Sequence, residues 1–218
     1  TALAAAGVFS YRDALAVVAE RGRAMAAAAD ANPSSMAAVI GADLETVESA
    51  CSARRSEGGS LWVANINAPG QGVVAGGRDD IAWLEENASE LGLRRVMGLA
   101  VAGAFHSPLM QPASDRLAAA LEGVEISEPR FPVYSNVTAS PVGSGELVPT
   151  LVDQVVSPVR FAETLERMAA AGIDTFVHVG PGDVTAGLAR RTVKGSNVVT
   201  VSSLDDVGVA VEALGSIS

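Results

Sequence analysis

The alternation of segment types between residues 34 and 101 most constrains what this chain can fold into. Four short apolar runs typical of strands alternate with two amphipathic helices, and a Pro69-Gly70 turn joins the middle two strands. In chain order, the predicted elements are a strand over 35–40, a helix over 44–55, strands over 61–67 and 72–76, a helix over 79–91 and a strand over 94–101. The order β-α-β-β-α-β is that of a ferredoxin-like subdomain.

The flanking residues, 1–33 and 102–218, alternate helices with more widely spaced strands. Ser10 and Asp13 form an S-x-x-D start for a long helix that ends before Pro33. Later strands are expected over 131–136, 175–180 and 198–202, with helices between them. Such alternation favours a parallel sheet covered by helices. We therefore predict an α/β protein in which residues 1–33 and 102–218 form a large core and residues 34–101 form an inserted subdomain.

Composition argues against several classes of function. A net charge of −10 argues against a nucleic-acid surface, and no run of about eighteen apolar residues is present to span a membrane. Cys51 is the only cysteine, so it cannot form an internal disulfide, and an intracellular, cytoplasmic location is expected. Cys51, His106 and His178 are too scattered to predict a zinc site, and no metal is expected.

The segment Gly103-Ala104-Phe105-His106-Ser107 follows directly after the predicted subdomain and contains one of only two histidines. A histidine where a strand ends, at the junction of a subdomain and a core, is a candidate general base. A hydrogen-bonded histidine in a structural corner fits the same pattern. Sequence position alone leaves both interpretations open.

Arg21 lies on the apolar side of the first long helix. On a helical wheel it falls within an arc of apolar residues, namely Ala14, Leu15, Val17, Val18, Gly22 and Met25. A buried guanidinium needs an anionic or hydrogen-bonding partner. It could therefore bind a substrate carboxylate through two parallel hydrogen bonds, or form a structural ion pair.

Several catalytic motifs are absent from the 218 residues. They contain neither the phosphate loop G-x-x-x-x-G-K-[ST] nor the dinucleotide motif G-x-G-x-x-G. Gly180-Pro181-Gly182 is a weak phosphate-site candidate, because any strand-to-helix turn favours such residues. His178, inside a predicted strand, is interpreted as structural. A G-x-S-x-G nucleophile motif is also missing, so the sequence shows nothing obvious for His106 to activate.

Taken together, nine segments resemble the acyltransferases of fatty-acid and polyketide synthesis, the malonyl-CoA:acyl carrier protein transacylases above all. In chain order they are residues 5–8, 13–15, 21–25, 36–41, 65–71, 75–76, 103–110, 154–158 and 180–182. The resemblance covers essentially the whole chain. It implies a parallel-sheet, hydrolase-like core that carries the ferredoxin-like subdomain.

The resemblance also implies a two-step reaction. In the family, a serine in a G-H-S-x-G elbow takes a malonyl group from malonyl-CoA and passes it to the phosphopantetheine thiol of acyl carrier protein, without a cofactor. The family's serine falls a few residues before the segment that matches Thr1. We therefore expect a missing N-terminal portion of the same protein to carry the nucleophile, and residues 1–218 alone to be inactive.

By resemblance, His106 is the general base and the backbone carbonyl of Gln154 orients it. Arg21 corresponds to the arginine that binds the free carboxylate of malonyl, and Asn65 to an active-site asparagine of less certain role. Phenylalanine before the histidine goes with malonyl, and serine there with methylmalonyl. Phe105 therefore predicts a preference for malonyl.

Acyl carrier protein is acidic, so an acidic chain needs a local basic patch to dock it. The best candidates are Arg190, Arg191 and Lys194, and the alternatives are Arg54, Arg55, Arg94 and Arg95. Other functions that fit the sequence are a non-catalytic acyl-CoA or carrier-protein binding module, a polyketide-synthase acyltransferase and a general serine hydrolase.

Overall fold

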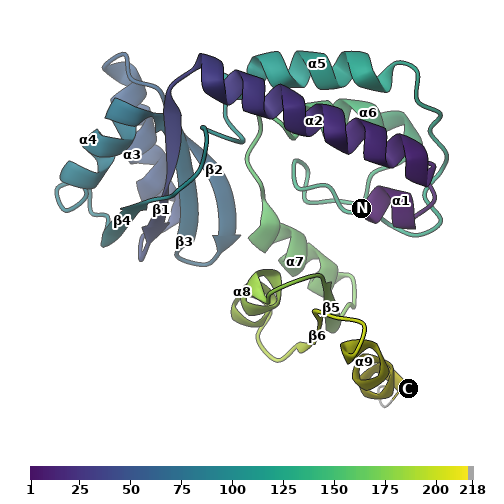
Figure 1. Ribbon diagram of the computed structural model, residues 1–218. Helices are drawn as coiled ribbons and strands as arrows, with labels where there is room; N and C mark the ends of the chain where they lie inside the picture. Colours follow the sequence, from purple (N-terminus) through teal and green to yellow (C-terminus); the bar gives the residue numbers. More distant parts are fainter. Residues whose placement is uncertain (216–218) are drawn as a thin grey trace. The chain divides into compact units, whose positions relative to one another are not determined.

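The computed structural model describes residues 1–215. They form two compact units, one over Thr1–Phe161 and one that begins at Ala162 (Figure 1). The first unit contains α1 (Ala2–Ala5), α2 (Tyr11–Ala31), β1 (Ser34–Ile40), α3 (Leu44–Ser56), β2 (Leu61–Ala68), β3 (Gln71–Gly77), α4 (Arg78–Glu86), β4 (Arg95–Gly98), the 3-10 turn η1 (Pro108–Met110), α5 (Gln111–Leu121) and α6 (Ser144–Asp153). The second contains α7 (Phe161–Ala170), β5 (Thr175–Val179), α8 (Val184–Thr192), β6 (Asn197–Val201) and α9 (Asp206–Gly215). The mixture of sheets and helices confirms the predicted α/β class.

The four strands of the first unit form one antiparallel sheet in the order β2-β3-β1-β4. Helices α3 and α4 pack against this sheet through an apolar core that includes Val39, Cys51, Leu61, Val74 and Leu84. Leu61 and Leu84 are completely buried, and burial of such a side chain stabilises the fold by about 1.5–3 kcal/mol. The sheet is therefore an independent layer with its own core.

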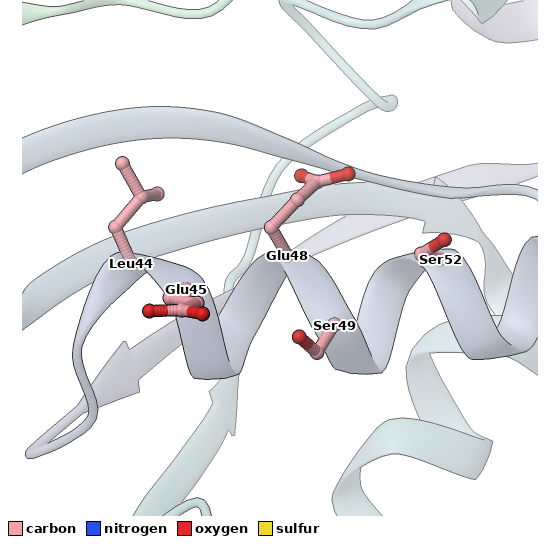
Figure 2. Close-up of a pocket in the computed structure, with 5 residues that line it drawn as sticks. All are labelled: Leu44, Glu45, Glu48, Ser49 and Ser52. Atoms are coloured by element: carbon pink, nitrogen blue, oxygen red, sulfur yellow. The ribbon is translucent and has the colours of Figure 1, made fainter.

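The outward side of α3 carries a shallow hollow (Figure 2). Its lining residues are Leu44, Glu45, Glu48, Ser49 and Ser52. Two carboxylates and two hydroxyls face this hollow, and none of its lining residues is among the predicted site residues. It is a surface feature of the sheet layer rather than part of the candidate active site.

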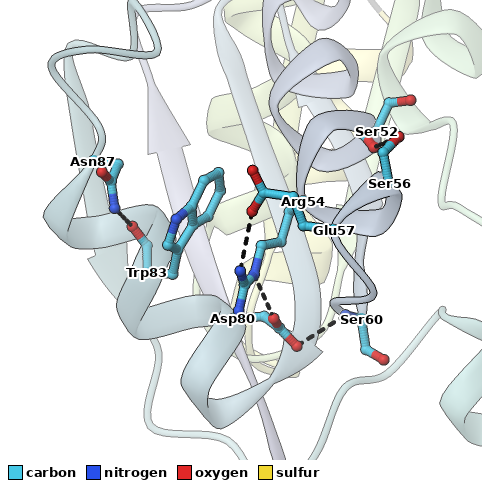
Figure 3. A network of polar contacts seen from close by, with 8 residues as sticks. All are labelled: Ser52, Arg54, Ser56, Glu57, Ser60, Asp80, Trp83 and Asn87. Atoms are coloured by element: carbon cyan, nitrogen blue, oxygen red, sulfur yellow. Dashed lines mark hydrogen bonds and ion pairs between the residues drawn. The ribbon is translucent and has the colours of Figure 1, made fainter.

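A polar network joins α3 to α4 at one end of the sheet (Figure 3). Arg54 Nε donates to Asp80 Oδ1 at 2.7 Å, and the other oxygen of Asp80 accepts from the Ser60 backbone N–H at 2.9 Å. The guanidinium of Arg54 also lies 5.1 Å from the ring centre of Trp83, at cation–π distance. A Cβ at Gly59 would lie 2.6 Å from Asp80 Oδ1, so the network requires glycine there. Arg54 is thus committed to structure.

The helical layer of the first unit is built on α2 and α5, which run side by side (Figure 1). The Ser10 side chain accepts a hydrogen bond from the Asp13 N–H at 3.1 Å, which confirms the predicted helix start. Small buried residues on α2, Ala24 and Ala28, belong to the same core as Leu117 of α5. Alanines let the two helices approach closely.

The predicted strand over 131–136 was wrong. Tyr134 makes only an isolated bridge to Pro141, and Val142 N–H donates to the Val133 carbonyl at 3.0 Å. The segment therefore folds back on the loop that follows it. Pro132 lacks a backbone donor, so this stretch forms a local bridge instead of a continuous ladder.

In the second unit, β5 pairs in parallel with β6, and α8 connects them. His178 on β5 bonds to the Thr185 hydroxyl, and its Nε2 lies 3.1 Å from the Gly180 carbonyl oxygen. Gly180 and Gly182 have positive φ angles of 140° and 82°. His178 therefore holds the glycine-containing turn between β5 and α8.

Candidate functional site

His106 lies in the loop between β4 and η1, and a backbone carbonyl orients its ring. Its Nδ1 is 2.9 Å from the backbone oxygen of Gln154, the residue that ends α6. A carbonyl oxygen only accepts hydrogen bonds, so Nδ1 carries the proton and Nε2 is left as the basic nitrogen of the neutral ring. This is the tautomer that a general base needs.

The surroundings of His106 keep its imidazole neutral. Burial is the largest effect and lowers the pKa of His106, while the hydrogen bond to the Gln154 carbonyl raises it. The positive charge of Arg21 lowers the pKa further, and the Ser157 backbone carbonyl raises it slightly. The pKa lies below the ordinary value of 6.5, so the ring is deprotonated at neutral pH.

Arg21 lines an apolar cavity of about 220 Å³ among α1, α2, α5 and α6. The cavity walls include Leu3, Phe9, Val17, Leu117 and Leu151, and Gln154 lines it as well. Burial lowers the pKa of Arg21, although an arginine remains charged at any physiological pH. The cavity thus contains a half-buried cation, and Gln154 connects this cavity to His106.

The face of α2 around Arg21 is more open than the sequence predicted. Val17 and Met25 pack against the core, but Leu15 is 53% exposed and Val18 59% exposed, and Gly22 is exposed too. The predicted arc is too wide. Helical periodicity shows which side of the helix is apolar, but it does not show how much of that side the neighbouring elements cover. In the described part of the chain, α5 packs against α2, and Ala24 and Ala28, which were not part of the predicted arc, belong to the core that the two helices share.

Phe105 and Asn65 lie on the sheet side of the His106 loop. Phe105 is half-buried and packs against apolar residues of both the helical layer and the sheet. Asn65 sits at a register shift in β2 and bridges Val159, which follows Gln154 by five residues. The backbone N–H groups of Ile66 and Val159 complete this bridge at 2.8 Å each. The structure therefore brings Arg21, Phe105, His106 and Gln154 together by direct or shared contacts, and the β2–Val159 bridge ties Asn65 to the segment after Gln154.

The three candidate docking residues lie in the second unit. Arg190 and Arg191 occupy the last turn of α8, and Lys194 follows in the next loop; all three are exposed. Arg190 donates to the Val198 carbonyl at 3.2 Å, and Arg191 to the Gly187 carbonyl at 3.2 Å. By contrast, Arg54 and Arg55, two of the alternatives, already pair with carboxylates.

Two buried serines next to the site were missed by the sequence analysis. The hydroxyls of Ser34 and Ser107 both bond to the backbone of Ala104, two residues before His106. Ser107 adjoins the histidine in the sequence and could have been noticed. Ser34 is 70 residues from Ala104, and no local signal marks it.

The described residues contain no group of three or more histidine, cysteine, aspartate or glutamate side chains placed to hold a metal ion. Within the same residues, no helix is both long and apolar enough to cross a membrane.

A neutral histidine that a backbone carbonyl orients can act as the base that activates a nucleophile, and the arginine in the neighbouring cavity can bind an anionic group. The chain belongs to the acyl transferase domain family, whose sequence profile matches residues 1–209.

Individual relatives agree with this assignment. The chain is similar to the malonyl CoA-acyl carrier protein transacylase of Bacillus subtilis, with 35% identity over 215 residues, or 98% of this chain and 68% of the relative. The crystal structure of an acyl-carrier-protein S-malonyltransferase from Bartonella henselae matches with a TM-score of 0.91 and 38% identity, over 98% of this chain and 68% of that one. A malonyl-transacylase solved in complex with its type II PKS acyl-carrier protein matches with a TM-score of 0.91 and 34% identity, over 97% and 68%.

Proposed function

We propose that this chain provides the general base and the malonyl-binding residues of a malonyl-CoA:acyl carrier protein S-malonyltransferase of fatty-acid biosynthesis. The observation that carries the proposal is the 2.9 Å contact between His106 Nδ1 and the Gln154 carbonyl, beside the cavity that Arg21 lines. Similarity to a type II PKS transacylase makes polyketide synthesis the alternative pathway.

The proposed reaction has two balanced half-reactions. In the first, His106 Nε2 removes the proton of a serine hydroxyl, the oxygen attacks the thioester carbonyl of malonyl-CoA, and the proton passes to the departing coenzyme A thiolate. In the second, the phosphopantetheine thiol of acyl carrier protein attacks the malonyl-serine ester, and the serine recovers its proton. A thioester is exchanged for a thioester, so no redox cofactor is needed.

Gln154 acts through its backbone in this scheme. Its carbonyl fixes the Nδ1–H tautomer, as a carboxylate does in a Ser-His-Asp triad, and stabilises the imidazolium that forms transiently. Because the acceptor is a backbone oxygen, substitution of the Gln154 side chain leaves the hydrogen bond chemically possible.

Arg21, Phe105 and Asn65 are proposed to select the substrate. Arg21 offers a planar pair of donors that matches the free carboxylate of malonyl. Phe105, directly before the base, restricts room for a 2-methyl branch and so favours malonyl over methylmalonyl. Asn65, which lies at the register shift of β2, is the third proposed substrate-binding residue, as the family resemblance implies.

The acyl-accepting serine has no G-x-S-x-G counterpart in the 218 residues. The family resemblance implies that a serine in a G-H-S-x-G motif accepts the malonyl group in this reaction. We also propose that acyl carrier protein docks on Arg190, Arg191 and Lys194, whose charges are exposed on the second unit.

The same resemblance supports a finer description of the fold. We propose that residues 34–101 are a ferredoxin-like subdomain, supported by the element order β1-α3-β2-β3-α4-β4 and the antiparallel strand order β2-β3-β1-β4. Residues 1–33 and 102–218 would then belong to a hydrolase-like core, supported by the parallel pairing of β5 and β6.

The decisive test is the mass of the full-length protein after incubation with malonyl-CoA. We expect a mass increase of one malonyl group, mapped to a serine by peptide sequencing and lost when acyl carrier protein with its phosphopantetheine arm is added. The His106→Ala variant should form this adduct far more slowly. If the wild-type protein acquires no malonyl group, the proposed function is wrong.

A further inference from the structure

Two buried serine hydroxyls bond to both polar backbone groups of Ala104 in the loop that carries His106. Ser34, the first residue of β1, is 1% exposed, and its Oγ accepts a hydrogen bond from the Ala104 N–H at 3.0 Å. Ser107 is completely buried, and its Oγ donates to the Ala104 carbonyl at 2.6 Å. Ala104 is itself completely buried, so water cannot replace either partner.

The loop needs this anchoring because His106 has an unusual backbone conformation. Its φ angle is +59°, in the left-handed region that residues other than glycine rarely adopt. Such a conformation costs about 1–2 kcal/mol and persists only where neighbouring contacts hold it. Near the histidine, short-range backbone bonds are Phe105 N–H to the Gly103 carbonyl at 3.1 Å and Met110 N–H to the Ser107 carbonyl at 3.0 Å. The long-range bond from Ser34 connects this loop to another element.

Ser34 also connects the loop to the helix that carries Arg21. Its Oγ donates its own proton to the Asn32 carbonyl at 2.9 Å, and Asn32 is the residue that caps the C-terminal end of α2. Gly103 packs against the same helix end, where a Cβ would lie 2.6 Å from Ala29 Cβ. The loop is therefore held against α2 by a tight backbone contact and by a hydrogen-bond chain through Ser34.

We propose that Ser34 is a positioning residue of the acyl transfer: it fixes the loop that presents His106 and sets this base relative to Arg21 on α2. The inference rests on the proposed function of those two residues. Ser34 touches neither substrate nor reacting atoms; it acts through Ala104. Ser107 completes the anchor from within the loop.

The test compares Ser34→Ala with Ser35→Ala in the full-length protein. Ser35 is the next residue of β1 and therefore points to the opposite face, so it is a matched control. Ser34→Ala leaves the buried Ala104 N–H without its partner. We expect kcat for malonyl transfer to fall about 10-fold, since a misplaced catalytic group can cost up to about 100-fold. KM for malonyl-CoA should change less than kcat, Ser34→Thr should recover most of the rate, and Ser35→Ala should match wild type.

A second readout does not depend on activity. The ring signals of His106 can be assigned in the full-length protein from their loss in His106→Ala, and they can then be followed by NMR as the pH is varied. Burial holds the pKa of His106 down, and Arg21 is the charged group that adds to this effect. In Ser34→Ala the loosened loop admits water, so the pKa of His106 should rise toward 6.5.

Each outcome decides the proposal. An unchanged His106 titration together with a rate loss no larger than the unfolded fraction would show that Ser34 is merely structural and would overturn it. If Ser34→Ala does not fold, Ser107→Ala provides the same comparison, and an unchanged titration there also overturns the proposal. If wild type transfers no malonyl group but His106 still shifts in Ser34→Ala, the proposed function fails while the anchoring of the loop stands.

Discussion

Under the proposed function, replacement of Arg21 by glutamine should remove the preference of the site for malonyl over acetyl. The Arg21 side chain lines an apolar cavity and is half-buried. Water therefore competes little for the hydrogen bonds between Arg21 and a carboxylate bound in the cavity. Hydrogen bonds to a charged partner contribute about 1.5–3 kcal/mol each. Loss of a bidentate pair, partly replaced by the glutamine amide, should cost about 2–4 kcal/mol, or roughly 30- to 700-fold in kcat/KM.

The assay compares malonyl-CoA with acetyl-CoA as donors to acyl carrier protein in the full-length enzyme. Acetyl has no free carboxylate, so its kcat/KM should change little in Arg21→Gln while that of malonyl falls. Arg21→Lys keeps the charge and loses the planar pair of donors, so its kcat/KM for malonyl-CoA should lie between those of wild type and Arg21→Gln. Arg12→Gln, on the exposed side of the same helix, is the matched control.

The Arg21→Gln substitution should lower kcat/KM for malonyl-CoA but raise the pKa of His106. The positive charge of Arg21 lowers the pKa of His106, so its removal should raise that pKa and move the acidic limb of the pH–rate profile to higher pH. Equal losses for malonyl and acetyl, with no displacement of the acidic limb, would refute the placement of Arg21 beside both substrate and base.

Four further predictions follow from the structure. In wild type, kcat/KM should fall with acid only below pH 6.5, because burial lowers the pKa of His106 and only its neutral form is a base. Leu84→Ala should lower the free energy of unfolding by about 2–5 kcal/mol in urea titrations, since Leu84 is completely buried beneath the sheet. Charge reversal of Arg190 and Arg191 to glutamate should raise KM for acyl carrier protein and leave hydrolysis of malonyl-CoA unchanged. Phe105→Ser should raise the kcat/KM of methylmalonyl-CoA relative to malonyl-CoA in a competition assay.

Each of these has an outcome that contradicts it. An acidic limb above pH 6.5 would mean that His106 is not the buried base. A loss below about 1 kcal/mol in Leu84→Ala would mean that the sheet core can collapse around the missing side chain. An unchanged KM for carrier protein would discard Arg190 and Arg191 as its docking site, and equal kcat/KM for the two thioesters in wild type would remove the role of Phe105.

The sequence predicted most of the local structure. The strands and helices between residues 34 and 101 lie within a few residues of their expected positions, because alternation and helical periodicity are local signals. The helix over 79–91 is an exception, since α4 ends at Glu86 and turns follow. Asn87 caps that end by donating from its side chain to the Trp83 carbonyl at 2.7 Å. The helix thus ends at this local capping bond, although the apolar pattern in the sequence continues to residue 91.

What the sequence could not predict depends on contacts between distant residues. Leu15 and Val18 share the apolar side of α2 with Val17, yet the neighbouring helices of the described chain cover only part of that side. The bond from Ser34 to Ala104 spans 70 residues and joins two unremarkable positions. His106 was located by its place after the last strand. Its contact with the Gln154 carbonyl, 48 residues away, was expected only from the family resemblance, because no local pattern connects the two residues.

Under the proposed function, the choice of a backbone carbonyl to orient His106 follows from the anionic substrate. A carboxylate in the place of the Gln154 oxygen would also fix Nδ1–H, but it would stand near Arg21, whose charge already reaches the imidazole. It would then pair with Arg21 and compete with the free carboxylate of malonyl, and it would raise the pKa of His106. A neutral carbonyl orients the ring without either effect. Arg21 can therefore remain available for the substrate while burial and its own charge keep the base deprotonated.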